Sequence, residues 1–123
     1  MAGTKRLICR GDELADCGEG VRFEFEHGEH GEPAFVVRFQ GEVHAYANRC
    51  AHLPYELDWI PGKFFDSEGL VLICSVHGAS YDPLTGQCVG GPCYHGLDKL
   101  AVEEFEGGVY LAEPWMLKER NNG

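Results

Sequence analysis

Two short motifs of cysteine and histidine constrain the fold of this chain more than any other feature. The first is Cys50-Ala51-His52, and the second is Cys74-Ser75-Val76-His77. Each motif follows a segment typical of a β-strand, and the loops they occupy are long, over 49–68 and 76–98. Each loop therefore offers one thiolate and one imidazole from the end of a strand that can hold them in place.

The ligand types leave more than one metal open. In a chain without a secretion signal, six cysteines indicate metal ligation or free thiols before a disulfide framework. Two cysteines and two histidines can hold a tetrahedral zinc ion, but zinc fingers usually pair like ligands in each half. One thiolate and one imidazole from each loop suit a two-iron cluster better, with both thiolates on one iron and both imidazoles on the other.

The residues around the motifs sharpen this choice. After His77 come Gly78-Ala79-Ser80-Tyr81-Asp82 and then Gly90-Gly91-Pro92. This segment resembles the second cluster loop of Rieske proteins, and CxH followed by Leu57 resembles the first; the resemblance covers about 43–100. It implies a [2Fe-2S] cluster, a Tyr81 hydroxyl that donates a hydrogen bond to a ligating sulfur, and four cluster ligands: Cys50, His52, Cys74 and His77.

The chain also departs from part of that family. Rieske subunits of respiratory and photosynthetic complexes join two further loop cysteines in a disulfide, and those positions hold Tyr55 and Val76 here. A serine near a cluster sulfide in those subunits corresponds to Ala79, and loss of such a donor lowers the reduction potential. Both departures are similar to the low-potential Rieske ferredoxins that serve oxygenases.

Strand patterns dominate the chain and predict an all-β protein with one domain over 1–123. Together with the resemblance, they imply a Rieske fold: a small antiparallel β sandwich or barrel as the base, and a cluster-binding subdomain of two loops. The expected strands are 7–9, 21–26, 34–39, 43–48, 69–75, 100–105 and 109–112, with a break over 27–33 and single helical turns at 12–15 and 56–60.

Charge limits the partners. The chain has 20 acidic and 10 basic residues, a formal net charge of −10, which argues against nucleic acid and anionic membranes. It favours protein partners with basic docking surfaces. No apolar run is long enough to span a bilayer and no signal peptide is visible, so the expected location is the cytoplasm.

The expected function is electron transfer without catalysis. The sequence has no nucleotide-binding glycine signature and no facial triad for non-haem iron. The resemblance implies a ferredoxin that carries single electrons from a flavin-containing reductase to an oxygenase or similar terminal enzyme. Two alternatives remain: a tightly bound small subunit of an oxygenase or nitrite-reductase-like assembly, and a zinc-stabilised binding module.

Several residues outside the motifs carry weaker expectations. Cys88 and Cys93 could be extra ligands, a redox pair or packing residues, and packing is favoured because free cysteine behaves as a small hydrophobe. His44 is expected on the exposed side of its strand. Two further groups are expected to be free thiols (Cys9 and Cys17) and loop anchors (Trp59, Phe64 and Phe65).

Overall fold

The computed structural model describes residues 6–27, 30–49, 56–58, 60, 62–74, 78–91 and 95–112. In these ranges the regular secondary structure is almost entirely β, as predicted. The elements are β1 (Arg6–Arg10), the 3-10 turn η1 (Gly11–Glu13), β2 (Val21–His27), β3 (His30–Phe39), β4 (Glu42–Ala47), β5 (Leu72–Ile73), β6 (Ser80–Tyr81), β7 (Cys88–Gly90), β8 (Lys99–Leu100), β9 (Val102–Phe105) and β10 (Gly108–Leu111).

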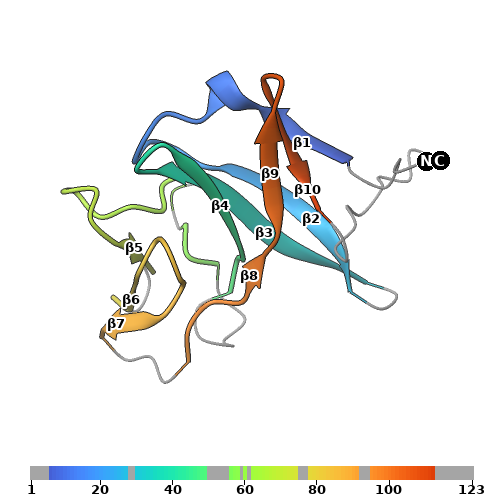
Figure 1. Ribbon diagram of the computed structural model, residues 1–123. Helices are drawn as coiled ribbons and strands as arrows, with labels where there is room; N and C mark the ends of the chain where they lie inside the picture. The colour runs from blue at the N-terminus through green and yellow to red at the C-terminus, as the bar shows by residue number, and fades with distance from the viewer. Residues whose placement is uncertain are drawn as a thin grey trace.

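These strands form three antiparallel sheets (Figure 1). Two form the base, with strand orders β1-β10-β9 and β2-β3-β4-β8, and the small third sheet is β5-β6-β7. The third sheet lies at one end of the molecule, and β8 leads from that end back to β9. The Rieske-type division into a β base and a loop-bearing subdomain is therefore confirmed.

The two base sheets pack against each other to form the first hydrophobic core. Cys9, Val109 and Leu111 come from the smaller sheet, and Phe25 and Val36 are among the residues from the larger one. Alternate side chains of a strand point to opposite faces of its sheet. One face of β3 therefore contributes to this core.

The opposite face of β3 forms part of a second core, which lies between the larger base sheet and the small third sheet. Residues 34–37 (Ala34, Phe35, Val36 and Val37) are all fully buried, because β3 is covered on both faces. Phe35 stacks on Phe64, with ring centroids 3.9 Å apart. This core thus joins the base to the first loop, and Phe64 is an anchor as predicted.

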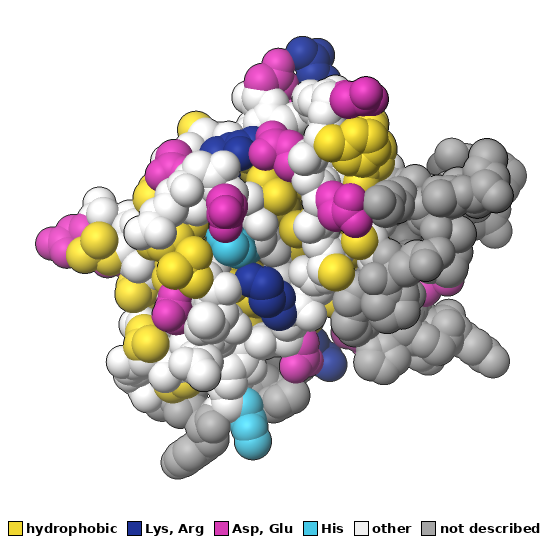
Figure 2. Space-filling model, viewed as in Figure 1, with side chains coloured by type: hydrophobic (Ala, Val, Ile, Leu, Met, Phe, Trp, Pro, Cys, Tyr) yellow, Lys and Arg dark blue, Asp and Glu magenta, His cyan; other side chains and the backbone are white. Residues whose placement is uncertain are grey.

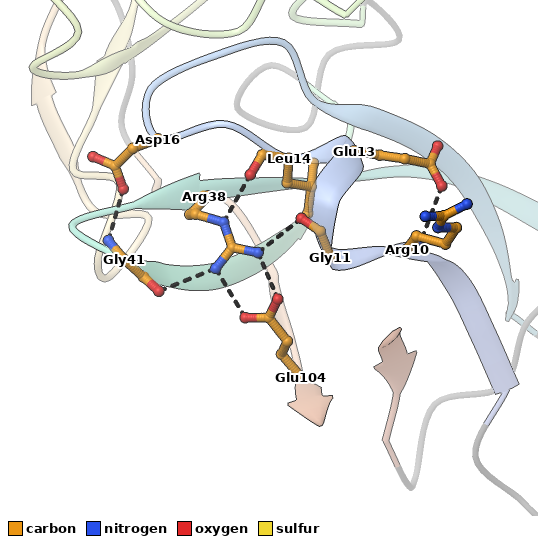
Figure 3. A network of polar contacts seen from close by, with 8 residues as sticks. All are labelled: Arg10, Gly11, Glu13, Leu14, Asp16, Arg38, Gly41 and Glu104. Carbon is orange, nitrogen blue, oxygen red and sulfur yellow. Dashed lines mark hydrogen bonds and ion pairs between the residues drawn. The ribbon is translucent and has the colours of Figure 1, made fainter. Parts of the chain in front are cut away.

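Arg38, near the end of β3, ties four segments of the base together (Figure 3). Its guanidinium donates to both carboxylate oxygens of Glu104 on β9, at 2.8 and 2.6 Å. It also donates to the carbonyl oxygens of Gly11, Leu14 and Gly41. The network fixes η1 and the β3–β4 turn against the sheet that carries β9.

Three of the expected elements were wrong in detail. β3 begins at His30 rather than after a break over 27–33, because the hairpin with β2 stays paired as far as His27 and His30. The expected turn over 56–60 is not helical at any of its described positions. Over 69–74, the described part of the strand expected over 69–75, only β5 is a strand. The Asp66 carboxylate accepts the Leu70 and Val71 N–H groups and turns the chain before it.

The helical turn expected at 12–15 corresponds to η1, one position earlier in the chain. The hairpins expected around 40–42 and 106–108 are confirmed as β3–β4 and β9–β10. Among the described residues, no helix has the length and apolarity needed to cross a membrane.

Candidate metal centre

The second motif begins at the end of β5, in a turn closed by backbone hydrogen bonds. The Cys74 N–H donates to the Ala79 carbonyl at 2.9 Å, and the Gly78 N–H donates to the Cys74 carbonyl at 2.8 Å. Gly78 has φ +76°, a backbone conformation that residues other than glycine rarely adopt. Cys74 is therefore held against Gly78 and Ala79, and the Cys74 side chain is fully buried.

The 88–91 segment packs directly on this turn. A Cβ atom on Gly91 would lie 2.6 Å from the Gly78 carbonyl oxygen and 2.8 Å from the Ala79 Cα. Gly91 also has φ +81°. Only glycine permits this approach. The absence of a side chain at Gly91 therefore lets the two backbone segments of the second loop lie in contact.

The first loop starts from a buried polar group. Asn48 directly follows β4 and is fully buried, and its N–H donates to the Pro33 carbonyl of β3 at 2.9 Å. Its side-chain oxygen accepts the Leu57 N–H at 2.8 Å, and its amide nitrogen donates to Asp58 at 3.0 Å. The side chain of Asn48, at the start of the segment that contains Cys50 and His52, therefore binds the residues at the end of that segment.

The bases of the two loops meet in the second core. Leu57 and Phe64 from the first loop share this core with Cys74 and Tyr81 from the second. All four side chains are fully buried. The fold thus brings together the two chain segments that the sequence marked as ligand-bearing.

The predicted site residues differ in what the structure says of them. Cys74 is buried and is not in a disulfide, which fits a thiolate ligand better than a surface thiol. Cys50, His52 and His77 lie outside the described residues. Tyr81 is buried in the same core as Cys74, and its expected hydrogen bond to a ligating sulfur remains a prediction.

The remaining cysteines divide into bonded and free. Cys88 on β7 packs against the second core, as favoured, but it is disulfide-bonded rather than a free thiol. Cys93 lies outside the described residues. Cys9 and Cys17 are free thiols as predicted, and burial raises the pKa of the Cys9 thiol to about 11.

A polar cluster supports the second loop from β4 and β8. The Tyr46 hydroxyl donates to the Pro83 carbonyl at 2.6 Å, and the Lys99 ammonium donates to the Leu84 carbonyl at 2.7 Å. Lys99 also lies 3.1 Å from Nδ1 of His44. His44 is only 8% exposed, so its predicted exposure was wrong; Lys99 and the 82–84 turn lie over that side of β4.

Sequence reasoning missed the residues that hold the first loop. Arg22, Asn48 and Asp58 come from separate segments and show no spacing that links them. The one available signal was a polar Asn at the end of an apolar strand, because buried polar side chains need hydrogen-bond partners.

Comparisons with known proteins agree with this arrangement. A family model described as Rieske [2Fe-2S] domain matches residues 5–105, a range that includes both motifs. A search of curated protein sequences finds no match.

Solved structures of similar fold include two ferredoxins. The ferredoxin of Sphingomonas yanoikuyae B1 has a TM-score of 0.70 at 25% identity, with 89% of this chain and 99% of that chain covered. The ferredoxin of carbazole 1,9a-dioxygenase from Nocardioides aromaticivorans IC177 has a TM-score of 0.70 at 24% identity, covering 89% and 98%. The terminal oxygenase of the same system matches at 0.69 and 23%, covering 95% of this chain and 31% of that one.

Proposed function

This chain belongs to the family of Rieske [2Fe-2S] domains, and we propose that it is an electron carrier that passes single electrons to an oxygenase or similar terminal enzyme. One observation carries the proposal: the family match spans both Cys/His motifs, whose loop bases share one buried core. The similarity to two ferredoxins over nearly their whole length supports a carrier role.

Four residues would hold the cluster. In the proposal, Cys50 and Cys74 ligate one iron, and His52 and His77 ligate the other. The bound cluster supplies a one-electron redox couple, and neutral imidazoles in place of two thiolates make it accept an electron more readily than an all-cysteine cluster. Cys74 is the one of these ligands in the described part, and its burial beside Tyr81 supports its assignment.

The surface suggests the kind of partner. Acidic side chains are spread over the face seen in Figure 2, and the whole chain has a net charge of −10. We propose that a flavin-containing reductase and the terminal oxygenase offer basic docking surfaces, which would steer association with an acidic carrier. A solved complex of similar fold contains an oxygenase and a ferredoxin. The single domain over 1–123 and the cytoplasmic location remain predictions.

Visible absorption spectra of the purified protein, recorded before and after chemical reduction, test the carrier role. The oxidised protein should be reddish brown, contain iron and acid-labile sulfide in equal amounts, and take up one electron per two iron atoms. Its reduced form should be reoxidised without a bound organic substrate being changed. If the protein is colourless and contains zinc, the carrier role is wrong and the chain is a zinc-stabilised module.

A further inference from the structure

The first loop is closed by a side-chain clasp that the ligand motifs do not include. Asn48 binds the Leu57 N–H and the Asp58 carboxylate, residues nine and ten positions later in the sequence. The clasp therefore brings together the two ends of the segment that contains Cys50 and His52. Closing a loop in this way removes conformational freedom that the ligands would otherwise have.

Asp58 is a buried acid with a full set of partners. Its side chain is fully buried; one oxygen accepts from Asn48, and the other accepts the Gly62 N–H at 2.9 Å. Nε of Arg22 lies 3.4 Å from that second oxygen, and the Arg22 side chain is 41% exposed. A buried charge without such partners would be strongly unfavourable, so the loop closes only in the arrangement that supplies them.

Gly62 continues this network to the base. It has φ +87°, and its carbonyl oxygen accepts the Gly20 N–H at 2.8 Å. Arg22 lies on β2, and its second contact is with Glu56 at 2.5 Å. The end of the first loop is thus attached to β2 and to the segment before it.

We propose that Asn48 and Asp58 are positioning residues for the cluster, and that the Arg22–Asp58 ion pair sets its reduction potential. This inference rests on the proposed function. Cys50 follows Asn48 by two residues, so their Cα atoms lie within about 7 Å of each other. Asp58 bonds directly to Asn48, which places its charge at the start of the ligand segment.

The two charges of the pair should act in opposite directions. Reduction adds a negative charge to the cluster, so a nearby negative charge opposes it and a positive charge favours it. Asp58→Asn should therefore raise the potential, and Arg22→Gln should lower it. The shift from Arg22→Gln should be the smaller one, because solvent screens the more exposed group. A purely structural role gives no reason for opposite signs.

The clasp makes a separate prediction about cluster retention. Asn48→Ala and Asp58→Asn should lose iron to a chelator about tenfold faster than the parent protein, as expected when a partner that orients ligands is removed. The amide that replaces the Asp58 carboxylate has a single accepting oxygen, so it can satisfy only one of the two donors that the carboxylate now satisfies. The double variant should lose iron no faster than the faster single variant, since both changes break one unit.

Glu104→Gln is a matched control. Like Asp58, Glu104 is an acid paired with an arginine, in this case Arg38. Pro33 is the β3 residue that Asn48 bonds, and Arg38 lies five residues further along β3, about 16 Å away at strand spacing. This change should lower the thermal midpoint while leaving the potential and the electron paramagnetic resonance (EPR) spectrum unchanged. Its rate of iron loss should stay within about twofold of the parent.

Redox titration and chelator kinetics on the purified full chain decide the matter. Opposite potential shifts together with faster iron loss support the inference. If the parent holds the cluster but both charge variants shift the potential in one direction, or not at all, the inference is wrong and the proposed function stands. A parent protein without iron and sulfide would overturn both. If Asp58→Asn does not fold, Arg22→Gln alone still tests the charge effect, because Arg22 is partly exposed and a raised or unchanged potential in this variant would contradict the inference.

Discussion

Single glycines decide how closely the second loop can fold on itself. Gly78 allows the chain to reverse after Cys74, and Gly91 allows the backbone of the opposite arm to contact that reversal. A Cβ on Gly91 would meet the opposite backbone, whereas a Cβ on Gly78 would meet no atom and would only strain its positive φ. The shape of the loop that follows Cys74, a proposed ligand, therefore depends on residues that cannot themselves bind metal.

Gly91→Ala tests this dependence. The new Cβ would clash with the Gly78 carbonyl, and alanine would be strained at φ +81°. We expect a loss of about 1–3 kcal/mol in the free energy of unfolding, measured by urea denaturation. Gly41→Ala is the control, because Gly41 has a similar φ of +82° but open space around the added atom. Equal losses in the two variants would mean that backbone strain alone explains the effect.

His44 makes stability depend on pH. Burial, with the nearby Lys99 ammonium, lowers the pKa of His44 below its usual 6.5, although Glu42 and Asp82 act in the opposite sense. Between 6.5 and that lower pKa, the unfolded chain binds a proton at this residue that the folded chain does not, so the contribution to stability falls as the pH falls.

His44→Gln removes this titration. The stability difference between the parent protein and the variant should shrink when urea unfolding is measured at about pH 5.5 instead of about pH 7.5. A difference that stays constant or grows on acidification would show that the folded protein accepts the proton at least as readily as the unfolded chain.

At the scale of elements, β3 is the strand on which both cores depend. Phe35 faces the second core, called here the loop core, and Val36 faces the first core, called here the base core. Arg38 joins the far end of the strand to η1 and β9. A strand buried on both faces shows a continuous apolar run, and residues 34–37 have one. The position of the loops is therefore coupled to the packing of the base.

Glu104→Gln measures how much the Arg38 network contributes. The Arg38 guanidinium lowers the pKa of Glu104 below its ordinary 4.5. The pair should stabilise the fold by about 1–2 kcal/mol at neutral pH, a value reduced for its partial exposure. This contribution is complete above pH 4.5 and is lost as the pH falls through the pKa of the folded state, so the variant and the parent should converge in acid.

Local pattern predicted the strands better than it predicted their ends. Alternation over 21–26 predicted β2. The segment with His30 and Pro33 was predicted to be a break from its residue types, but pairing with β2 keeps this part of β3 extended. Leu70 falls in the strand expected over 69–75, yet it lies outside β5 and is 61% exposed because Asp66 turns the chain. The Asn48–Asp58 bond joins residues with no common period, so only the folded chain reveals it.

At the scale of the whole molecule, two hydrophobic cores divide the tasks. The base core lies between the two larger sheets, and the loop core joins the larger of these sheets to both ligand-bearing segments. The motifs were visible in sequence because ligand chemistry restricts residue types. The buried contacts below them were not, since many apolar residues could fill the same space.

EPR of the dithionite-reduced protein tests the central claim most directly. The account predicts a [2Fe-2S] signal whose average g-value is lower than that of an all-cysteine cluster, because one iron has two histidine ligands. A spectrum of the all-cysteine type, or no signal together with zinc in elemental analysis, would contradict shared ligation by the two loops.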